Sequence, residues 1–122
     1  MPTEAKPPYP HLITLLLLGL LFGLFAGGHH PSSAHLFPAP WDKAAHLSLF
    51  ALLGVLLKLR WPRLPALAIL GICALLGLGD EIHQAFVPGR QPDWADGFAD
   101  LLGCGLGLFL LHYSQRFRGV KP

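Results

Sequence analysis

The chain has 122 residues and a formal net charge of +2, with nine Lys and Arg against seven Asp and Glu. Hydrophobic residues make up 52% of it and charged residues only 13%, whereas soluble domains carry about 25% charged residues. This composition excludes an ordinary soluble domain, and the small net charge without a basic run argues against a nucleic-acid partner. The length accommodates a single domain, residues 1–122.

Four apolar blocks follow one another along the chain, and each approaches the roughly 20 residues that a helix needs to cross a bilayer. They extend from about Leu12 to Gly28, Ala44 to Trp61, Leu64 to Phe86 and Asp96 to Tyr113. The second and third blocks are joined by so few residues that they must form an antiparallel helical hairpin. The sequence therefore predicts an all-α fold, a bundle of four transmembrane helices.

The first block could instead be a cleaved signal peptide, because the small residues Ser32, Ser33 and Ala34 follow it. The segment from Met1 to His11 contains one Lys, one Glu and four prolines, which makes it a poor positively charged leader. We therefore expect the block to remain as a helix. The mass of the mature protein distinguishes the two alternatives.

The distribution of charge predicts the orientation, since cytoplasmic loops of membrane proteins are enriched in Lys and Arg. If the N-terminus is cytoplasmic, seven basic residues lie on that side: Lys6, Lys58, Arg60, Arg63, Arg116, Arg118 and Lys121. Lys43 and Arg90 then lie outside, together with six of the seven acids: Asp42, Asp80, Glu81, Asp93, Asp96 and Asp100. We expect both termini in the cytoplasm and the acidic residues at the outer face.

Three of the predicted helices carry polar residues at their outer ends, each on a single face, because residues three or four apart share a helical face. The residues that we expect to converge, with Arg90 in the loop above them, are Lys43, His46, Glu81, Gln84, Asp96 and Asp100. Ionisable groups inside membranes are costly and usually functional. The pattern therefore predicts a ligand-binding pocket just below the outer surface.

Smaller patterns indicate how the helices begin and meet. Gly103 and Gly107 form a small-xxx-small step, which lets another helix approach closely. Asp93 precedes the fourth block and predicts an N-terminal cap. The segment Val87-Pro88-Gly89 predicts a turn that folds the loop toward the carboxylates.

With these residues in place, the chain resembles the VanZ-like family of small bacterial membrane proteins. The resemblance covers about Trp41 to Gly107. It rests on Lys43-x-x-His46 with Phe50, Glu81-x-x-Gln84-x-Phe86, Pro88-Gly89-Arg90, Asp96, Gly103 and Gly107. Asp100 departs from the family pattern, which often has Asn there, so no role is carried over to it.

The resemblance implies a multi-pass protein of the bacterial cytoplasmic (inner) membrane, with its polar motif on the extracytoplasmic side. It places the chain among cell-envelope proteins, in a family named for an association with teicoplanin resistance. It implies no agreed reaction, and the name is no evidence that this chain confers resistance.

The first functional hypothesis is that the pocket binds an anionic lipid or a lipid-linked envelope precursor by its headgroup. Lys43 and Arg90 would contact the anionic part of such a ligand. The residues that would set the hydrogen-bond geometry are His46, Glu81, Gln84 and Asp96.

Two other hypotheses stay open. The cluster can serve packing alone, in a structural subunit that docks another membrane protein or a second copy, since interhelical polar contacts are worth about 1 kcal/mol each. Alternatively, Glu81 acts as a general base in a membrane-embedded hydrolase or transferase. The chain lacks a Ser or Cys nucleophile motif, and the sequence assigns no catalytic residue beyond this suggestion.

No cofactor and no metal are expected. Phosphate-binding and nucleotide fingerprints are missing from the sequence, and two cations, Lys43 and Arg90, would oppose a divalent ion at the carboxylates. Cys73 and Cys104 lie within apolar blocks, so we expect buried thiols rather than a disulfide. The histidines of the first loop, His29, His30 and His35, are expected to be solvated.

Overall fold

The protein is described by a computed structural model over residues 6–29, 41–89 and 91–119. These residues form four α-helices and no strands, which confirms the all-α class. The helices are α1 (Pro10–His29), α2 (Trp41–Arg60), α3 (Ala66–Ala85) and α4 (Trp94–Gly119). The expected loop histidines His30 and His35 lie outside the described residues.

The helix boundaries differ from the apolar blocks where local hydrogen bonding decides them. α4 begins two residues early, because the Asp93 carboxylate accepts the backbone N–H of Ala95 at 2.9 Å and caps the helix as predicted. It also continues six residues past Tyr113, to Gly119, since an apolar block marks what enters the membrane and not where a helix ends. α3 begins later than predicted because Pro65 is extended, with φ −67° and ψ 152°.

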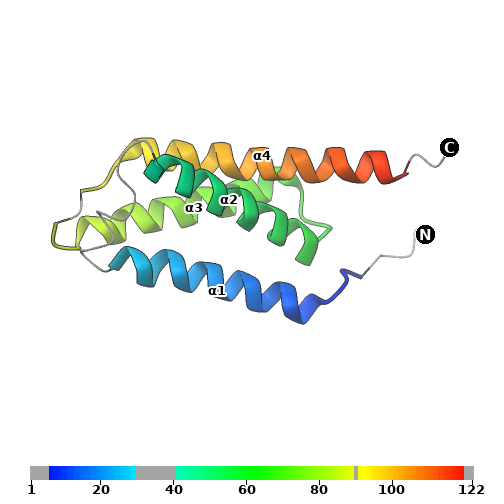
Figure 1. Cartoon of the computed structure of the whole chain (residues 1–122), viewed down its shortest axis with the longest axis horizontal. Coiled ribbons are helices and arrows are strands. Elements are labelled where there is room, and N and C mark those ends of the chain that lie inside the picture. The colour runs from blue at the N-terminus through cyan, green and yellow to red at the C-terminus, as the bar shows by residue number, and fades with distance from the viewer. Residues whose placement is uncertain (1–5, 30–40, 90, 120–122) are drawn as a thin grey trace.

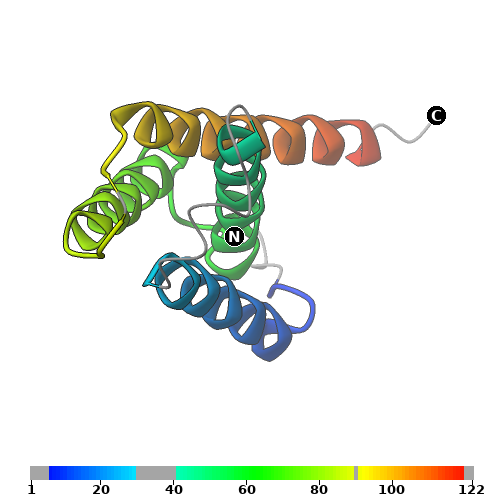
Figure 2. The ribbon, with the colours of Figure 1, turned by 60° about the vertical axis from the view of Figure 1, so that its left-hand side comes forward.

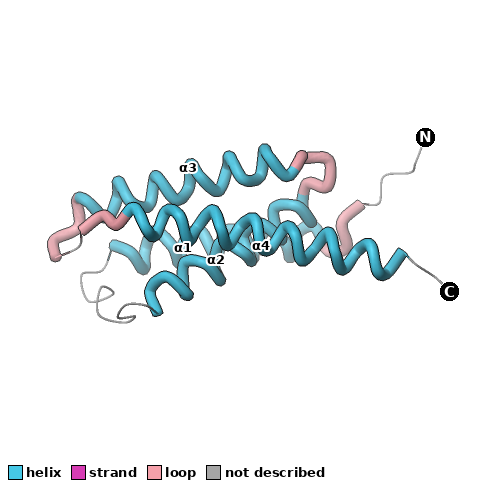
Figure 3. Tube along the Cα trace, turned by 90° about the horizontal axis from the view of Figure 1, so that it is seen from above, coloured by secondary structure: helices cyan, strands magenta, loops and turns pink. Residues whose placement is uncertain are grey.

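The four described helices run roughly antiparallel to their chain neighbours, and the start of α1 and the end of α4 lie at the same end of the bundle (Figure 1). α2 and α4 make the most extensive contact, α3 packs on both, and α1 packs on α2 and α3 without touching α4. Figure 2 shows α1 and α4 on opposite sides of α2. The short loops before α3 and before α4 lie at opposite ends of the bundle (Figure 3).

Glycines on α4 allow the close approach of α2. A Cβ added at Gly103 would lie 2.9 Å from Cα of Leu47 and would overlap its carbonyl oxygen, and one added at Gly107 would meet Ala51 in the same way. Real Cβ atoms do not come this close to a backbone, so only glycine permits this separation of the helices. The predicted small-xxx-small step is therefore the contact surface between α4 and α2.

Among the described helices, three are long and apolar enough to cross a membrane: α1, α3 and α4. α2 does not meet that criterion, because it carries Asp42 and Lys43 near its start and Lys58 and Arg60 near its end. The structure thus supports a membrane protein with at least three spans by length and composition.

Candidate polar site at one end of the bundle

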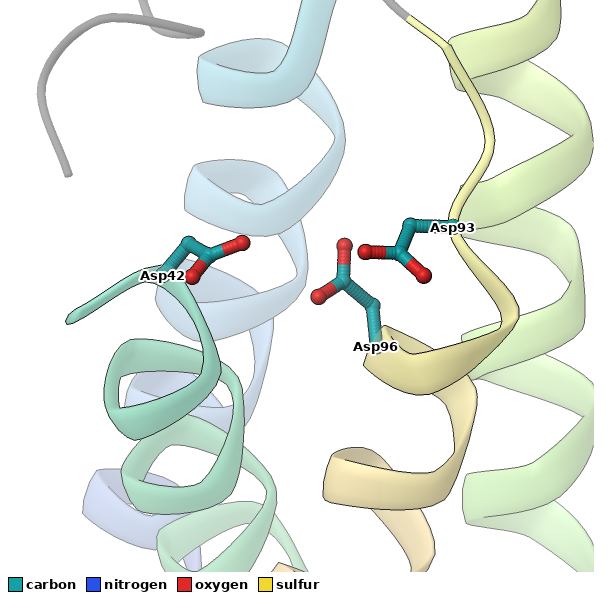
Figure 4. A group of neighbouring side chains, drawn as sticks. All are labelled: Asp42, Asp93 and Asp96. Atoms are coloured by element: carbon teal, nitrogen blue, oxygen red, sulfur yellow. The ribbon is translucent and has the colours of Figure 1, made fainter. Parts of the chain in front are cut away.

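Lys43, in the first turn of α2, lies at the centre of a group of three carboxylates. Its ammonium donates to Asp93 Oδ2 at 2.6 Å, Asp96 Oδ1 at 2.6 Å and Asp42 Oδ2 at 2.9 Å. The three aspartates point toward one another from α2, from the loop before α4 and from α4 (Figure 4). We call Asp42, Asp93 and Asp96 the acidic triad. An ammonium has three N–H donors, and all three are used here.

These ion pairs shift the titration of the groups that lie before the apolar parts of the helices. Hydrogen bonding to Lys43 lowers the pKa of Asp93 and that of Asp42 below the usual value of 3.8. Although partial burial opposes the charged form, the hydrogen bonds to the triad raise the pKa of Lys43 above 10.5. All three groups are therefore charged at neutral pH.

One turn deeper, His46 connects α2 to the same face of α4. Its Nδ1 lies 2.7 Å from Asp100 Oδ1, and its Nε2 lies 3.7 Å from Asp96 Oδ2. The Asp100 side chain is only 1% exposed. His46 thus links the acidic triad to a carboxylate in the interior of the bundle.

The end of α3 closes the cluster from the other side with three buried polar residues, Asp80, Glu81 and Gln84. The Gln84 amide donates to Asp80 Oδ2 at 2.9 Å. The Glu81 carboxylate accepts the backbone N–H of Asp93 at 2.7 Å through Oε2. Glu81 therefore holds the start of α4 against α3 and lies directly beneath the acidic triad.

The buried carboxylate oxygens without a hydrogen-bond partner among the described residues include Asp42 Oδ1, Glu81 Oε1 and Asp100 Oδ2. Asp100 Oδ2 lies in the space that a Cβ would fill at Gly77, at 2.7 Å from that position, so α3 needs a glycine where the carboxylate packs. Buried acceptors without a donor are costly. The site therefore has unused capacity to accept hydrogen bonds.

An open hollow lies on the exposed face of α2, roughly opposite the face that carries Lys43 and His46. It measures about 380 Å³ and is lined by Trp41, Ala44, Ala45 and Ser48. The lining is mostly apolar and adjoins Asp42 and Lys43 in the chain. The hollow and the ionised cluster therefore share the first turns of α2 but lie on different faces of the helix.

The structure brings together five of the six residues that the sequence assigned to ligand binding: Lys43, His46, Glu81, Gln84 and Asp96. Arg90 lies outside the described residues, so its expected position above the carboxylates is not observed. Their function in ligand binding, and that of Glu81 in catalysis, stay predictions.

Sequence reasoning missed the partners of Lys43 and of Gln84. Asp42 and Asp93 were counted as outer-face acids, and Asp93 as a helix cap, but neither was expected to bind Lys43. Asp80 could have been found as a partner of Gln84, since residues four apart on a helix are neighbours. Asp100 was left without a function and is now the buried partner of His46.

The acidic triad also has the spacing of a metal site, because one oxygen from each carboxylate lies within 4.8 Å of the others. The Lys43 ammonium is bonded to the same three side chains. A divalent cation would have to displace that ammonium or be repelled by it. The triad is accordingly the partner of Lys43, and the expectation of no metal stays a prediction.

Cys73 on α3 and Cys104 on α4 are both buried and free, as predicted. They lie one turn deeper than Gly77 and Asp100 in their own helices, and their thiols are close enough to interact. They belong to the apolar core with Phe50 and Ile69.

Comparison with known proteins now identifies the family. The VanZ/LLP1 family matches residues 12–115, which is most of the chain and includes every residue of the polar cluster. The chain belongs to the VanZ/LLP1 family. The resemblance drawn from Lys43, His46, Glu81 and the glycine step is thereby confirmed.

A relative of this VanZ/LLP1 protein is an uncharacterized protein of the fission yeast Schizosaccharomyces pombe. The two are 32% identical over 124 residues, which covers 94% of this chain and 76% of the yeast protein. No solved structure matches the chain. Because a yeast has such a relative, similarity of this kind does not by itself place the chain in a bacterial envelope.

Proposed function

We propose that this VanZ/LLP1 protein crosses the membrane four times and binds a membrane lipid, or a lipid-linked envelope molecule, at its polar end. The observation that carries the proposal is the carboxylate cluster around Lys43, where Asp42 and Asp93 are partly exposed and the buried Glu81 Oε1 has no hydrogen-bond partner among the described residues. The headgroup would contact the cluster, and the hydrocarbon chain would pass around α2 to the apolar hollow of about 380 Å³ on its exposed face. Ligand sites commonly combine apolar walls with a few fixed polar groups.

The depth of α2 in the bundle supports four spans. At one end Lys43 bonds Asp96 at the start of α4, and at the other end the Arg60 guanidinium donates to Thr14 in the first turns of α1 at 3.0 Å. α2 therefore runs the full distance between the ends of two helices that are apolar enough to span. Its charged residues lie at those two ends, where charged side chains reach water or headgroups.

The charge distribution supports an outward-facing site. The described basic residues near the end of the bundle where α1 begins and α4 ends are Lys6, Lys58, Arg60, Arg63, Arg116 and Arg118. All six described acids belong to the opposite end. Basic residues mark the cytoplasmic side, so the polar end would face the extracytoplasmic side of the inner membrane if the chain is bacterial.

Within the site, the residues have different functions. Lys43 fixes α2 to α4 by its three ion pairs, and His46 fixes the carboxylates of α4. Glu81 has an oxygen left to accept a hydrogen bond, and Gln84 orients the neighbouring Asp80. Lys43 and His46 thus hold the site, while Glu81 and the exposed edges of the acidic triad would meet the ligand.

Native mass spectrometry of protein extracted in mild detergent tests the proposal. We expect the wild type to retain lipid, and Ala44→Phe, which fills the hollow, to lose it. The matched control is Leu67→Phe, because Leu67 is 79% exposed at the far end of α3. Lipid-free wild-type protein, or equal retention by Ala44→Phe, would contradict lipid binding at this hollow.

The structural hypothesis is favoured by one specific observation, namely that all three donors of Lys43 are used within the protein. If the cluster serves only packing, Glu81→Gln and Asp96→Asn should lower the melting temperature in proportion to any loss of function. If it binds a ligand, Glu81→Gln should lose bound lipid while it keeps the melting temperature of the wild type.

A further inference from the structure

We infer that the headgroup bound at this site carries a primary ammonium, as in an aminophospholipid. This inference rests on the proposed function and specifies its ligand. The sequence had suggested an anionic group contacted by Lys43 and Arg90. The described residues point to the opposite charge, for three reasons that concern donors, acceptors and net charge.

The donors that the described residues supply at the carboxylates are already used. Lys43 gives one hydrogen bond to each carboxylate of the acidic triad, and the Gln84 amide donates to Asp80. An anionic group placed here would have to break one of these bonds before it gained one. It would also enter beside carboxylates and be repelled by them.

The acceptors of the site are not all used. Glu81 is 2% exposed, its Oε2 is bonded to the Asp93 amide within the triad, and its Oε1 has no hydrogen-bond partner among the described residues. Asp42 Oδ1 is also without a partner there, while the side chains of Asp42 and Asp93 are 31% and 50% exposed. A ligand that approaches from outside therefore meets the exposed edges of the Asp42 and Asp93 carboxylates, which accept hydrogen bonds, while Glu81 Oε1 and Asp42 Oδ1 lie buried behind them.

The net charge of the described cluster also favours a cationic headgroup. The three carboxylates of the triad and the one ammonium of Lys43 leave two formal negative charges, and the buried Glu81 lies next to them. Lys43 itself shows that the site holds a primary ammonium, with carboxylate oxygens at 2.6, 2.6 and 2.9 Å. A second ammonium between Asp42, Asp93 and Glu81 would reduce the excess charge and use the remaining acceptors.

The test compares lipids with identical acyl chains in nanodiscs that contain the full chain, with bound lipid measured by native mass spectrometry. Phosphatidylethanolamine donates from a primary ammonium, phosphatidylcholine has a cation without donors, and phosphatidylglycerol is anionic. We expect phosphatidylethanolamine to bind about tenfold more tightly than either, the effect of one charge-assisted hydrogen bond. Glu81→Gln and Asp42→Asn should each remove most of this preference.

The control variant is Glu4→Gln, which neutralises a carboxylate in the segment before α1 and should leave the preference unchanged. If Glu81→Gln does not fold, Asp42→Asn tests the inference instead, because Asp42 lies at the surface of the triad. Equal or tighter binding of phosphatidylglycerol would overturn the ammonium inference and leave lipid binding intact. Failure of all three lipids to bind would overturn the proposed function itself.

Two further arms separate the sources of the signal. Free ethanolamine should compete only weakly, because it lacks the chain that fills the hollow. Full competition by ethanolamine at equal concentration would support an ammonium site but contradict a lipid ligand. Binding that requires Mg²⁺ and is lost with EDTA would mean that a metal bridges the carboxylates, which would overturn the inference.

Discussion

The contact between His46 and Asp100 is the residue pair on which the interior of the site most depends. Asp100 is buried, and its 2.7 Å contact with His46 is its one hydrogen bond among the described residues. We expect His46→Ala to lower the free energy of unfolding by about 3 kcal/mol, because removal of one partner leaves the other buried and unpaired. Denaturant unfolding in mild detergent measures the change.

A second substitution distinguishes this mechanism from simple loss of packing. In the His46→Ala protein, Asp100→Asn should regain roughly 1 kcal/mol, because a neutral amide is less costly to bury than a lone carboxylate. If the double variant is no more stable than His46→Ala alone, the contact does not contribute through charge.

The ion pairs of Lys43 predict a pH dependence. Hydrogen bonding to Lys43 lowers the pKa of Asp93 and of Asp42 below 3.8. Their contribution to stability is therefore present above pH 3.8 and is lost as the pH falls through the lowered pKa. For Lys43, burial acts in the other direction but the ion pairs prevail and raise the pKa above 10.5, so its contribution is present below pH 10.5 and is lost as the pH rises through that raised pKa.

The measurement is the difference in unfolding free energy between the wild type and Lys43→Met, taken at roughly pH 3, 7 and 11. The difference should be largest at the middle value and smaller at both extremes. Other carboxylates titrate in both proteins and cancel in the comparison. A difference that stays constant at the acidic value would show that the triad does not stabilise the fold through Lys43.

At the scale of the helices, the surface between α2 and α4 determines whether the site exists. Gly103→Ala should destabilise the protein by about 2 kcal/mol, as overpacking does, because its Cβ would overlap the Leu47 carbonyl. It should also weaken lipid binding, since Lys43 and Asp96 lie on the two helices that are pushed apart. The matched control is Gly71→Ala on α3, where an added Cβ meets nothing within 4 Å. Equal stability of the two variants would contradict the observed packing.

This arrangement of helices could largely be predicted from the sequence. Helical spacing places Lys43 with His46 and Glu81 with Gln84 on single faces, and short connections require that these ends of α2 and α3 meet the start of α4. The Gly103 step further indicated where a helix would approach. These features follow from local geometry and from chain connectivity, which a sequence records directly.

The pairing within the site could not be predicted in the same way. Which carboxylates reach Lys43 depends on the rotation of α2 against α4 and on the conformation of the residues before α4. Asp93 was predicted correctly as a cap, yet its second oxygen bonds Lys43. The charge of the ligand could not be predicted from the sequence either. It depends on which hydrogen-bond donors are already used within the protein.

At the scale of the whole molecule, the number of spans decides on which side the site lies. If α2 crosses the membrane, the chain crosses four times and its two ends share a side; if α2 lies on the surface, three crossings place the ends on opposite sides. We propose four crossings, on the ground that α2 reaches from Asp96 to Thr14. We therefore expect Lys6→Cys and Gly119→Cys to react with a membrane-impermeant maleimide only after the cells are permeabilised, and Gln91→Cys to react in intact cells. The wild type is the unlabelled control, since Cys73 and Cys104 are buried. Reaction of just one terminal cysteine in intact cells would mean an odd number of crossings. The loop before α4 and the loop after α1 would then lie on opposite sides of the membrane.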